Sequence, residues 1–293
     1  MSHKHPIIAV TGASGSGSEP VMSAFKHLFW REKVTAAVVQ GDGFHRYGRQ
    51  EMKEAVAASL KAGKRPITHF GPEGNLLPEL EALLAEYGKK GSGKSRNYVH
   101  CEADAAEHGQ PPGTLTPWAP LPENTDLLLY QGLHGGYVGE EADIARHVDL
   151  LIGVTPIVNL EWIQKLHKDC NDRGYSREAI THAILERMHD YVHHITPQFS
   201  RTHINFQRVP VVDTSNPFIA RDVPNLDESL MVIRFRYPKE VNFPYLLDML
   251  HDSFMSRPNT LVVPAGKALQ AMEVIFGPLL HQLMERRRAA KKG

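Results

Sequence analysis

Short continuous apolar runs recur along this chain, and amphipathic segments separate them. Apolar runs of about four to eight residues are typical of strands that are buried on both faces of a parallel sheet. Because such strands alternate here with helical patterns, we predict an α/β fold with three layers and a largely parallel sheet. The expected strands are Pro6–Thr11, Thr35–Gln40, Asp126–Gln131, Val148–Val154, Val209–Asp213, Ser229–Arg236 and Asn259–Pro264.

The amphipathic segments are expected to form the helices that cover this sheet. The segment from residue 90 to residue 122 is rich in Gly, Pro and charged residues, and it is expected to be an excursion from the sheet. The sequence shows no internal repeat and no low-complexity linker, so we predict a single domain over residues 1–293. The expected helices are Pro20–Lys33, Gln50–Ala62, Leu77–Tyr87, Leu160–Asp172, Arg177–His194 and Gly266–Arg288.

Composition excludes several classes of protein. Net charge is zero, so no overall field attracts the chain to nucleic acid or to a membrane surface. The two cysteines, Cys101 and Cys170, form no disulfide framework, which indicates a reducing compartment. The apolar run near the start is too short for a signal peptide, and no run approaches the roughly 18 apolar residues of a membrane span. We therefore predict a cytoplasmic protein.

A glycine-rich loop, "VTGASGSGSEP", follows the first predicted strand and precedes a predicted helix. Backbone N–H groups at such a helix start point at a bound phosphate, so the loop predicts a nucleotide site. The phosphate-loop motif would place Lys and then Ser or Thr where this chain has Ser18 and Glu19, and Pro20 follows. The predicted nucleotide-binding residues are Gly12, Ser14, Gly15, Gly17 and Ser18.

Two residues would lie on the metal side of this nucleotide site. Glu19 occupies the position that normally supplies the hydroxyl ligand of Mg²⁺, and Gln131 ends a strand where a metal-organising acid is expected. An amide can orient a water molecule but carries no charge for Mg²⁺. The cofactors expected are ATP and Mg²⁺, and the Glu19 carboxylate could replace the missing acid. Alternatively, Glu19 and Pro20 simply make a good helix start.

A second stretch, "GKKGSGKS" (Gly88–Ser95), matches the phosphate-loop motif letter for letter. It follows a predicted helix, however, and no strand precedes it. The motif needs a strand before it and a helix after it, so we interpret this stretch as a mobile basic loop.

The densest polar cluster is "QGDGFHRYGRQEMK". Asp42 follows a predicted strand at the carboxyl edge, where α/β sheets bind ligands. His45 follows, and Arg49 and Lys53 would share one face of the next helix. A carboxylate surrounded by cations suits an anionic substrate with a hydroxyl group to activate. The alternative is a solvated helix start with ordinary ion pairs.

A second charged cluster lies on the predicted helix that ends at Gly174. Its cationic end could close over phosphates as a lid, or it could be an ordinary charged helix face. Among the 17 histidines, three fall near one face of the following helix, which would permit a zinc site, although no acid or cysteine completes it. The lid residues are Lys165, Lys168, Asp169 and Arg173, and the three histidines are His182, His189 and His193.

Taken together, these motifs resemble bacterial phosphoribulokinases of the octameric type over essentially the whole chain. The resemblance implies a P-loop kinase with a sheet of the nucleotide monophosphate kinase type. The stretches that carry it are "GDGFHRYGRQEMK", "YVH" at Tyr98–His100, "GLHGG", "VNLEWIQKLHKD", "PQFSRTHINFQRVPVVDTSNPF" and "IRFR".

The resemblance implies transfer of the ATP γ-phosphoryl group to the C1 hydroxyl of ribulose 5-phosphate, as in the Calvin cycle. It also implies a homo-oligomer that responds to NADH and AMP. Asp42 would be the base, and Lys165 and Asp169 would belong to the catalytic helix. The sugar-phosphate contacts would be His45, Arg49, Lys53, Tyr98, His100 and Arg173, and the residues tied to effector control and subunit contacts would be Arg31, Arg234 and Arg257.

The departures from the family pattern gather on the nucleotide side, at residues 18–20, at Gln131 and at Lys168. They leave an alternative open, in which the chain is a catalytically impaired relative that binds sugar phosphate or an effector nucleotide without efficient turnover. The retained Asp42 and Asp169 favour an active kinase, because a pure binding protein has less need of both. A kinase for a different phosphorylated sugar is a further alternative.

Overall fold

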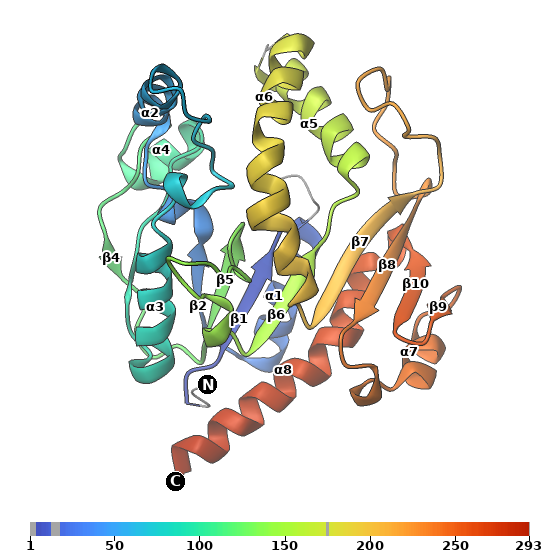
Figure 1. Cartoon of the computed structure of the whole chain (residues 1–293). Coiled ribbons are helices and arrows are strands. Elements are labelled where there is room, and N and C mark those ends of the chain that lie inside the picture. Colours follow the sequence, from blue (N-terminus) through green and yellow to red (C-terminus); the bar gives the residue numbers. More distant parts are fainter. Residues whose placement is uncertain (1–3, 13–17, 174–175, 293) are drawn as a thin grey trace.

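In the computed structural model, an eight-stranded sheet runs through the centre of the molecule (Figure 1). The structure describes residues 4–12, 18–173 and 176–292, without the side chains of residues 18, 19, 168, 169, 171–173 and 292. The strand order is β2-β5-β1-β6-β7-β8-β10-β9. The strands are β1 (Ile7–Thr11), β2 (Ala36–Gln40), β5 (Leu127–Gly132), β6 (Leu150–Val154), β7 (Ile204–Pro210), β8 (Ser229–Phe235), β9 (Phe254–Arg257) and β10 (Thr260–Pro264).

The predicted α/β fold is confirmed. Strands β2, β5, β1, β6 and β7 are parallel to one another, whereas β8, β10 and β9 extend the sheet in antiparallel fashion. One sheet thus takes strands from both halves of the chain, and the single domain over residues 1–293 stays a prediction. The excursion contains a two-stranded antiparallel sheet of β3 (Lys94–Ser95) and β4 (Ala119–Pro120).

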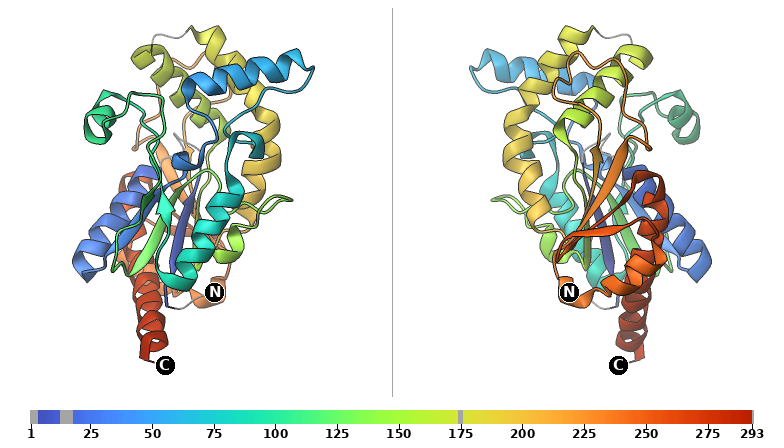
Figure 2. Two further views of the ribbon diagram at one scale, coloured as in Figure 1. Left: turned by 90° about the vertical axis from the view of Figure 1, so that its left-hand side faces the viewer. Right: turned by 90° about the vertical axis from the view of Figure 1, so that its right-hand side faces the viewer.

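Helices cover both faces of the large sheet (Figure 2). On one face, α1 and α8 pack on Ile8 and Val10 of β1, and Phe25 of α1 stacks on Phe276 of α8 with ring centroids 4.6 Å apart. On the other face, α3 packs on the alternate side chains of the same strand. The helices are α1 (Ser18–Glu32), α2 (Arg49–Lys61), α3 (Leu77–Lys90), α4 (Glu102–His108), α5 (Val158–Arg173), α6 (Arg177–Asp190), α7 (Phe243–Met249) and α8 (Ala268–Lys292).

One strand prediction is wrong in position. The apolar run Val209–Asp213 was expected to form a strand, but β7 ends at Pro210, and Val211 and Val212 are exposed. The strand instead uses the alternating segment that begins at Ile204, in which Ile204 and Phe206 are buried. It has antiparallel β8 on one side, so a continuous apolar run is not required there.

The other expected helices and strands differ less from those of the structure. The expected helix Arg177–His194 ends as α6 at Asp190 and continues as a π-helix over Tyr191–Ile195. The short α4, α7 and β9 were not predicted. Across the described ranges, none of the helices combines the length and apolarity that crossing a membrane would require.

Candidate active site

The carboxyl ends of three neighbouring strands meet at one edge of the sheet. Gln40 at the end of β2 pairs with Gln131 of β5, and the Gly12 amide after β1 donates a hydrogen bond to the Gly132 carbonyl at 3.2 Å. Asp42 follows β2 directly, on the short 3-10 turn Gly41–Phe44. This is the edge at which α/β sheets bind their ligands.

The strand–loop–helix frame of the first glycine loop is present. Strand β1 ends at Thr11 and helix α1 begins at Ser18, so the loop leads from a buried strand into a helix N-terminus. Ser14, Gly15 and Gly17 lie outside the described residues, as do the side chains of Ser18 and Glu19. Their roles toward a nucleotide and a metal therefore stay predictions.

The second motif lacks this frame. Within Gly88–Ser95, helix α3 continues to Lys90, Gly91 caps it with φ +71°, and Lys94 begins β3. The order is helix and then strand, the reverse of a phosphate loop. The expected loop is wrong for residues 88–90, which belong to α3; beyond them the Gly91 amide donates to the Tyr87 carbonyl at 2.7 Å and the Gly93 carbonyl accepts from the Leu121 amide at 2.9 Å. This stretch is a helix end followed by a short strand.

Replacement of Lys94 with Ala is therefore expected to leave ATP affinity within about twofold, since a phosphate loop requires a helix N-terminus that this stretch does not have. Calorimetric titration of ATP into the two proteins measures the effect. A loss of affinity of about tenfold, or roughly 1.4 kcal/mol, would show that this stretch binds the nucleotide phosphates.

The Asp42 carboxylate is held between two histidines. Its Oδ2 lies 3.0 Å from His100 Nε2, and its Oδ1 lies 3.5 Å from His45 Nε2. Burial raises the pKa of Asp42, but the hydrogen bond from His100 and the charges of His45 and His100 outweigh burial, so the pKa lies below its ordinary value. Asp42 is therefore a carboxylate at neutral pH and can accept a proton.

Arg96 fixes the turn that carries Asp42. Its Nε donates to the Gly43 carbonyl at 2.7 Å and its Nη2 donates to the His45 carbonyl at 2.8 Å, while its guanidinium lies 4.6 Å from the centroid of Trp118. A Cβ atom on Gly43 would lie 1.9 Å from the Arg96 carbonyl oxygen, so the close approach of these two segments requires glycine.

His45 is buried behind Asp42. Its Nδ1 lies 3.0 Å from Asn75 Oδ1, and its ring stacks on His69 with centroids 4.0 Å apart. Burial lowers the pKa of His45 even though Asp42 and Asn75 raise it, and burial also lowers the pKa of His69 to about 3. Both rings are therefore neutral near pH 7.

Three of the other predicted sugar-phosphate residues, Arg49, Tyr98 and His100, lie beside this pair. Arg49 Nη2 donates to the His100 carbonyl at 3.2 Å, and Lys53 follows one turn later on α2. Tyr98 lies between the two histidines, with its ring centroid 5.8 Å from that of His45 and 4.8 Å from that of His100. The structure thus brings together Asp42, His45, Arg49, Tyr98 and His100, and their roles toward a substrate stay predictions.

Asp42, Tyr98 and His100 border a cavity of about 230 Å³. Sequence reasoning missed several of its lining residues, because α4 was not predicted and its short sequence carries no strong helical pattern. It also missed Arg96 and Asn75, which contact the site from segments distant in sequence. The lining residues are Gln40, Asp42, Asn97, Tyr98, His100, Asp104 and His108.

The predicted lid residues lie on α5, which stands with α6 across from α2 and α4 at the end of the sheet where β1, β2 and β5 finish (Figure 1). A small apolar cluster that includes Leu166, Ile180 and Ile184 joins α5 to α6. Burial raises the pKa of Glu161 to about 7, and Lys165, four residues later, opposes this rise. The side chains of Lys168, Asp169 and Arg173 lie outside the description, so their roles stay predictions.

The three histidines of α6 and the π-helix that follows have local partners. His182 pairs with Glu186 at 3.4 Å, His189 pairs with Asp190 at 3.2 Å, and the rings of His189 and His193 stack 4.1 Å apart. Acids thus do lie beside two of them, contrary to expectation. Among the side chains that the structure describes, no group of three or more His, Cys, Asp or Glu residues could hold a metal.

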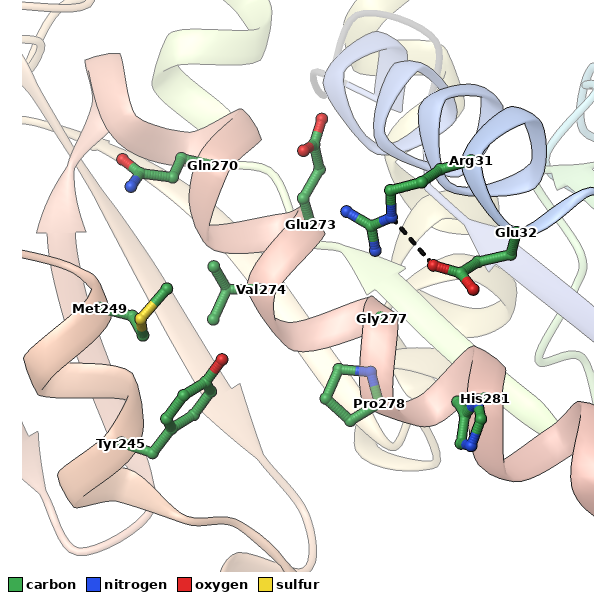
Figure 3. Close-up of a pocket in the computed structure, with 10 residues that line it drawn as sticks. All are labelled: Arg31, Glu32, Tyr245, Met249, Gln270, Glu273, Val274, Gly277, Pro278 and His281. Atoms are coloured by element: carbon green, nitrogen blue, oxygen red, sulfur yellow. Dashed lines mark hydrogen bonds and ion pairs between the residues drawn. The ribbon is translucent and has the colours of Figure 1, made fainter.

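The three arginines assigned to effector control do not meet within one chain. Arg31 lies at the end of α1 and lines a cavity of about 440 Å³ between α1, α7 and α8 (Figure 3). Arg234 and Arg257 both pair with Thr260 across β8, β10 and β9. Ile233, the neighbour of Arg234, belongs to the core under α1 and α8, so Arg234 faces the opposite side of the sheet from Arg31.

Comparisons with known proteins agree with this architecture. A family model described as the Phosphoribulokinase / Uridine kinase family matches residues 7–215. A phosphoribulokinase of Cupriavidus necator is 56% identical over 290 residues, covering 99% of both chains, and one of Nitrobacter vulgaris is 53% identical, covering 99% of this chain and 100% of the relative.

Among solved structures, a phosphoribulokinase from Rhodobacter spheroides superimposes with a TM-score of 0.90 at 49% identity, covering 98% of this chain and 100% of that chain. The similarity spans both the nucleotide side and the sugar side of the site, and it shows a kinase-type transferase. The chain therefore belongs to the phosphoribulokinase / uridine kinase family.

Proposed function

We propose that this protein transfers the γ-phosphoryl group of ATP to the C1 hydroxyl of ribulose 5-phosphate, forming ribulose 1,5-bisphosphate. The observation that carries the proposal is the deprotonated Asp42 carboxylate, held by His100 and His45 at the edge of the sheet where the first glycine loop also begins. The names of the full-length relatives support the choice of substrate.

In the proposed step, the C1 oxygen forms a bond to the γ-phosphorus while the bond from that phosphorus to the leaving ADP oxygen breaks. The hydroxyl proton passes to Asp42, which acts as the general base. Phosphoryl transfer depends mainly on positioning and on neutralisation of charge, so cations around the substrate matter as much as the base. Arg49 and Lys53 on α2 are proposed to bind the sugar phosphate, and an arginine fork can grip it with two hydrogen bonds.

Three further side chains would orient the sugar. His45 and His100 lie beside Asp42, and the Tyr98 ring lies beside both histidines, so that all three can hydrogen-bond the hydroxyl groups of ribulose. Lys165, Asp169 and Arg173 on α5 are proposed to approach the reacting phosphates from the opposite side as a lid, with Lys165 and Asp169 in the catalytic role.

The nucleotide side is proposed to bind ATP with Gly12, Ser14, Gly15, Gly17 and Ser18 at the start of α1. Mg²⁺ usually keeps several waters and takes one or two protein oxygens in addition to the phosphates, so it does not need a complete protein cage. Gln131 at the end of β5 and Glu19 at the start of α1 are the candidates for those oxygens. When bound, Mg²⁺ would neutralise charge on the phosphates.

The decisive experiment is an assay of the purified protein with Mg-ATP and ribulose 5-phosphate, in which ribulose 1,5-bisphosphate is identified by mass spectrometry. Ribose 5-phosphate and uridine serve as comparison substrates. Ribose 5-phosphate tests whether the protein distinguishes between phosphorylated sugars, and uridine tests whether it accepts a substrate without a phosphate group. The proposal expects the highest kcat/KM for ribulose 5-phosphate. Binding of ribulose 5-phosphate without product would support the catalytically impaired alternative, which the comparisons do not favour.

We further propose that NADH and AMP act at a site shared between copies of the chain in a homo-oligomer. The Arg31 cavity also contains Glu32 and Glu273, and Arg31 Nε donates to Glu32 at 2.9 Å (Figure 3). An anionic effector would therefore need additional cations. Arg234 and Arg257 are exposed on the other face of the sheet, so a second copy would have to supply them.

This proposal predicts a complementation result. Arg31→Ala and Arg234→Ala are each expected to abolish the response to NADH, whereas basal kcat changes less than about twofold, because each replacement lies away from the active site. Oligomers assembled from a mixture of the two variants are expected to regain part of the response, since some interfaces then contain both native arginines. If Arg31→Ala retains the full response, Arg31 has no part in the effector site.

A further inference from the structure

The side chain of Asn75 contacts the active site from behind, through His45. Asn75 is 2% exposed, and its Nδ2 donates to the carbonyl of His69 at 2.9 Å and to that of Gly71 at 2.6 Å. Its Oδ1 lies 3.0 Å from His45 Nδ1. Both ends of the amide are therefore engaged inside the protein.

These contacts fix which way the amide points. Rotation of the Asn75 amide by half a turn would place Oδ1 against the two carbonyl oxygens of His69 and Gly71, and two buried donors would be lost. Oδ1 must therefore face His45. Because Oδ1 can only accept, the His45 Nδ1 must carry the proton and donate it.

The other nitrogen of His45 then has a free lone pair. The neutral ring holds one proton, which resides on Nδ1, so the bare Nε2 faces Asp42 Oδ1 at 3.5 Å. The surroundings keep the ring neutral, because burial is the largest influence and the charges of His100 and Arg96 also lower the pKa of His45. Only Asp42 and the Asn75 hydrogen bond act in the other direction.

The tautomer matters for the basicity of Asp42. His100 already engages Oδ2 at 3.0 Å. If His45 carried its proton on Nε2, it would donate to Oδ1 as well, and a carboxylate that accepts hydrogen bonds on both oxygens is a weaker base. With the proton on Nδ1, Oδ1 remains free to take the substrate proton. The resulting O–H can then donate to His45 Nε2, so that the proton moves from the C1 oxygen to Asp42 and is stabilised there.

We propose that Asn75 is a positioning residue that holds His45 in the Nδ1–H tautomer and thereby keeps Asp42 Oδ1 basic. The inference rests on the proposed role of Asp42 as base. The side-chain polar atoms of Asn75 are bonded to His45, His69 and Gly71, so Asn75 would act through His45 and not on the substrate itself.

The direct test is the ¹⁵N spectrum of the histidine rings in the free protein near neutral pH. His45 is assigned by the signal that disappears in His45→Gln. The expected result is one protonated ring nitrogen, Nδ1, and one unprotonated nitrogen, Nε2. A His45 ring that is protonated at Nε2 overturns the proposal. This measurement needs no turnover, so it judges the inference separately from the proposed kinase activity.

The functional test compares Asn75→Ala with Thr68→Val. Thr68 lies in the same loop and donates to Asp190 Oδ2 at 2.6 Å, so its replacement loosens the loop without removing the acceptor at His45. Asn75→Ala is expected to shift His45 toward the Nε2–H tautomer and to lower kcat about 10- to 100-fold, the size seen when a group that orients a functional histidine is lost. Thr68→Val is expected to keep the tautomer and to change kcat by less than about threefold.

Comparison of the two variants distinguishes loss of the His45 tautomer from a general loosening of the loop. Thermal unfolding of both proteins shows whether they are comparably folded. If both lose kcat equally while His45 keeps its Nδ1 proton in both, Asn75 only supports the loop and the proposal is wrong. A loss of kcat confined to Asn75→Ala, with the tautomer shift in the same protein and KM for ribulose 5-phosphate changed less than kcat, supports it.

Discussion

Replacement of Asp42 with Asn is expected to lower kcat by about 10²- to 10⁴-fold, the contribution of a positioned general base. The amide has nearly the same shape as the carboxylate, and its oxygen can still accept from His100, so the cavity is preserved. It cannot take the hydroxyl proton, however. Binding of ribulose 5-phosphate is therefore expected to change much less than kcat.

The measurement combines steady-state kinetics with calorimetric binding of ribulose 5-phosphate to both proteins. Asp252→Asn is the matched control: it makes the same chemical change at an exposed carboxylate that pairs with Lys267 at 2.7 Å, far in sequence from the site. If Asp42→Asn retains kcat within about threefold, Asp42 does not act as the base, because loss of a general base costs far more.

The lowered pKa of Asp42 leads to a prediction about the pH dependence of kcat/KM. The pKa of Asp42 lies below its ordinary value of 3.8, so the carboxylate stays charged as the pH falls from 8 toward that value. A group with a lowered pKa loses its charge only below its ordinary range. Any loss of kcat/KM between pH 8 and pH 5 in the wild-type protein must therefore come from another group.

Much of the fold follows from local sequence patterns. Strands β1, β2 and β5 lie in the interior of the sheet or under α3, and their continuous apolar runs make them recognisable. Strand β7 was misplaced because its neighbour β8 is antiparallel, and the segment beginning at Ile204 alternates between buried and partly exposed side chains. A search for continuous apolar runs selects the later, exposed Val211 and Val212 instead.

The residues of the candidate site also fall into those that the sequence indicates and those that it does not. Asp42, His45 and Arg49 were predictable because they stand close together in one polar segment after a strand. Asn75 and Arg96 were not, because they reach the same turn from segments 30 and 51 residues away in sequence from His45. No periodicity or motif marks such contacts. They depend on the path of the loops above the sheet, which only the three-dimensional structure reveals.

The nucleotide side shows that changes at single residues are a weak guide to whether the protein is active. The changes at residues 18–20 and at Gln131 suggested an impaired relative, since each removes a familiar ligand of the nucleotide or the metal. Similarity to phosphoribulokinases over 99% of the chain carries more weight, because it covers the whole scaffold that positions both substrates. Phosphoryl transfer tolerates changes in individual ligands when other oxygens can serve the same metal.

The second large effect is expected at the proposed sugar-phosphate site. Arg49→Ala is expected to weaken binding of ribulose 5-phosphate by roughly 1.5–3 kcal/mol, or about 10- to 150-fold in Kd, the size of hydrogen bonds to a charged group. The Arg49 guanidinium lies beside the site, since it donates to the carbonyl of His100, whose ring contacts Asp42. Because the phosphate is bound in both the ground state and the transition state, KM is expected to rise more than kcat falls.

Arg49→Lys and Lys53→Ala complete this experiment. Arg49→Lys keeps the charge but loses the planar fork, so a partial loss of affinity between those of wild type and Arg49→Ala is expected if the phosphate is gripped by two hydrogen bonds. Lys53 lies four residues along the same helix, and its removal is expected to cost less, because an exposed ammonium contributes mainly a screened point charge. Unchanged binding in Arg49→Ala would place the sugar phosphate elsewhere, whereas equal losses in Arg49→Lys and Arg49→Ala would show that the geometry of the guanidinium, rather than its charge, recognises the phosphate.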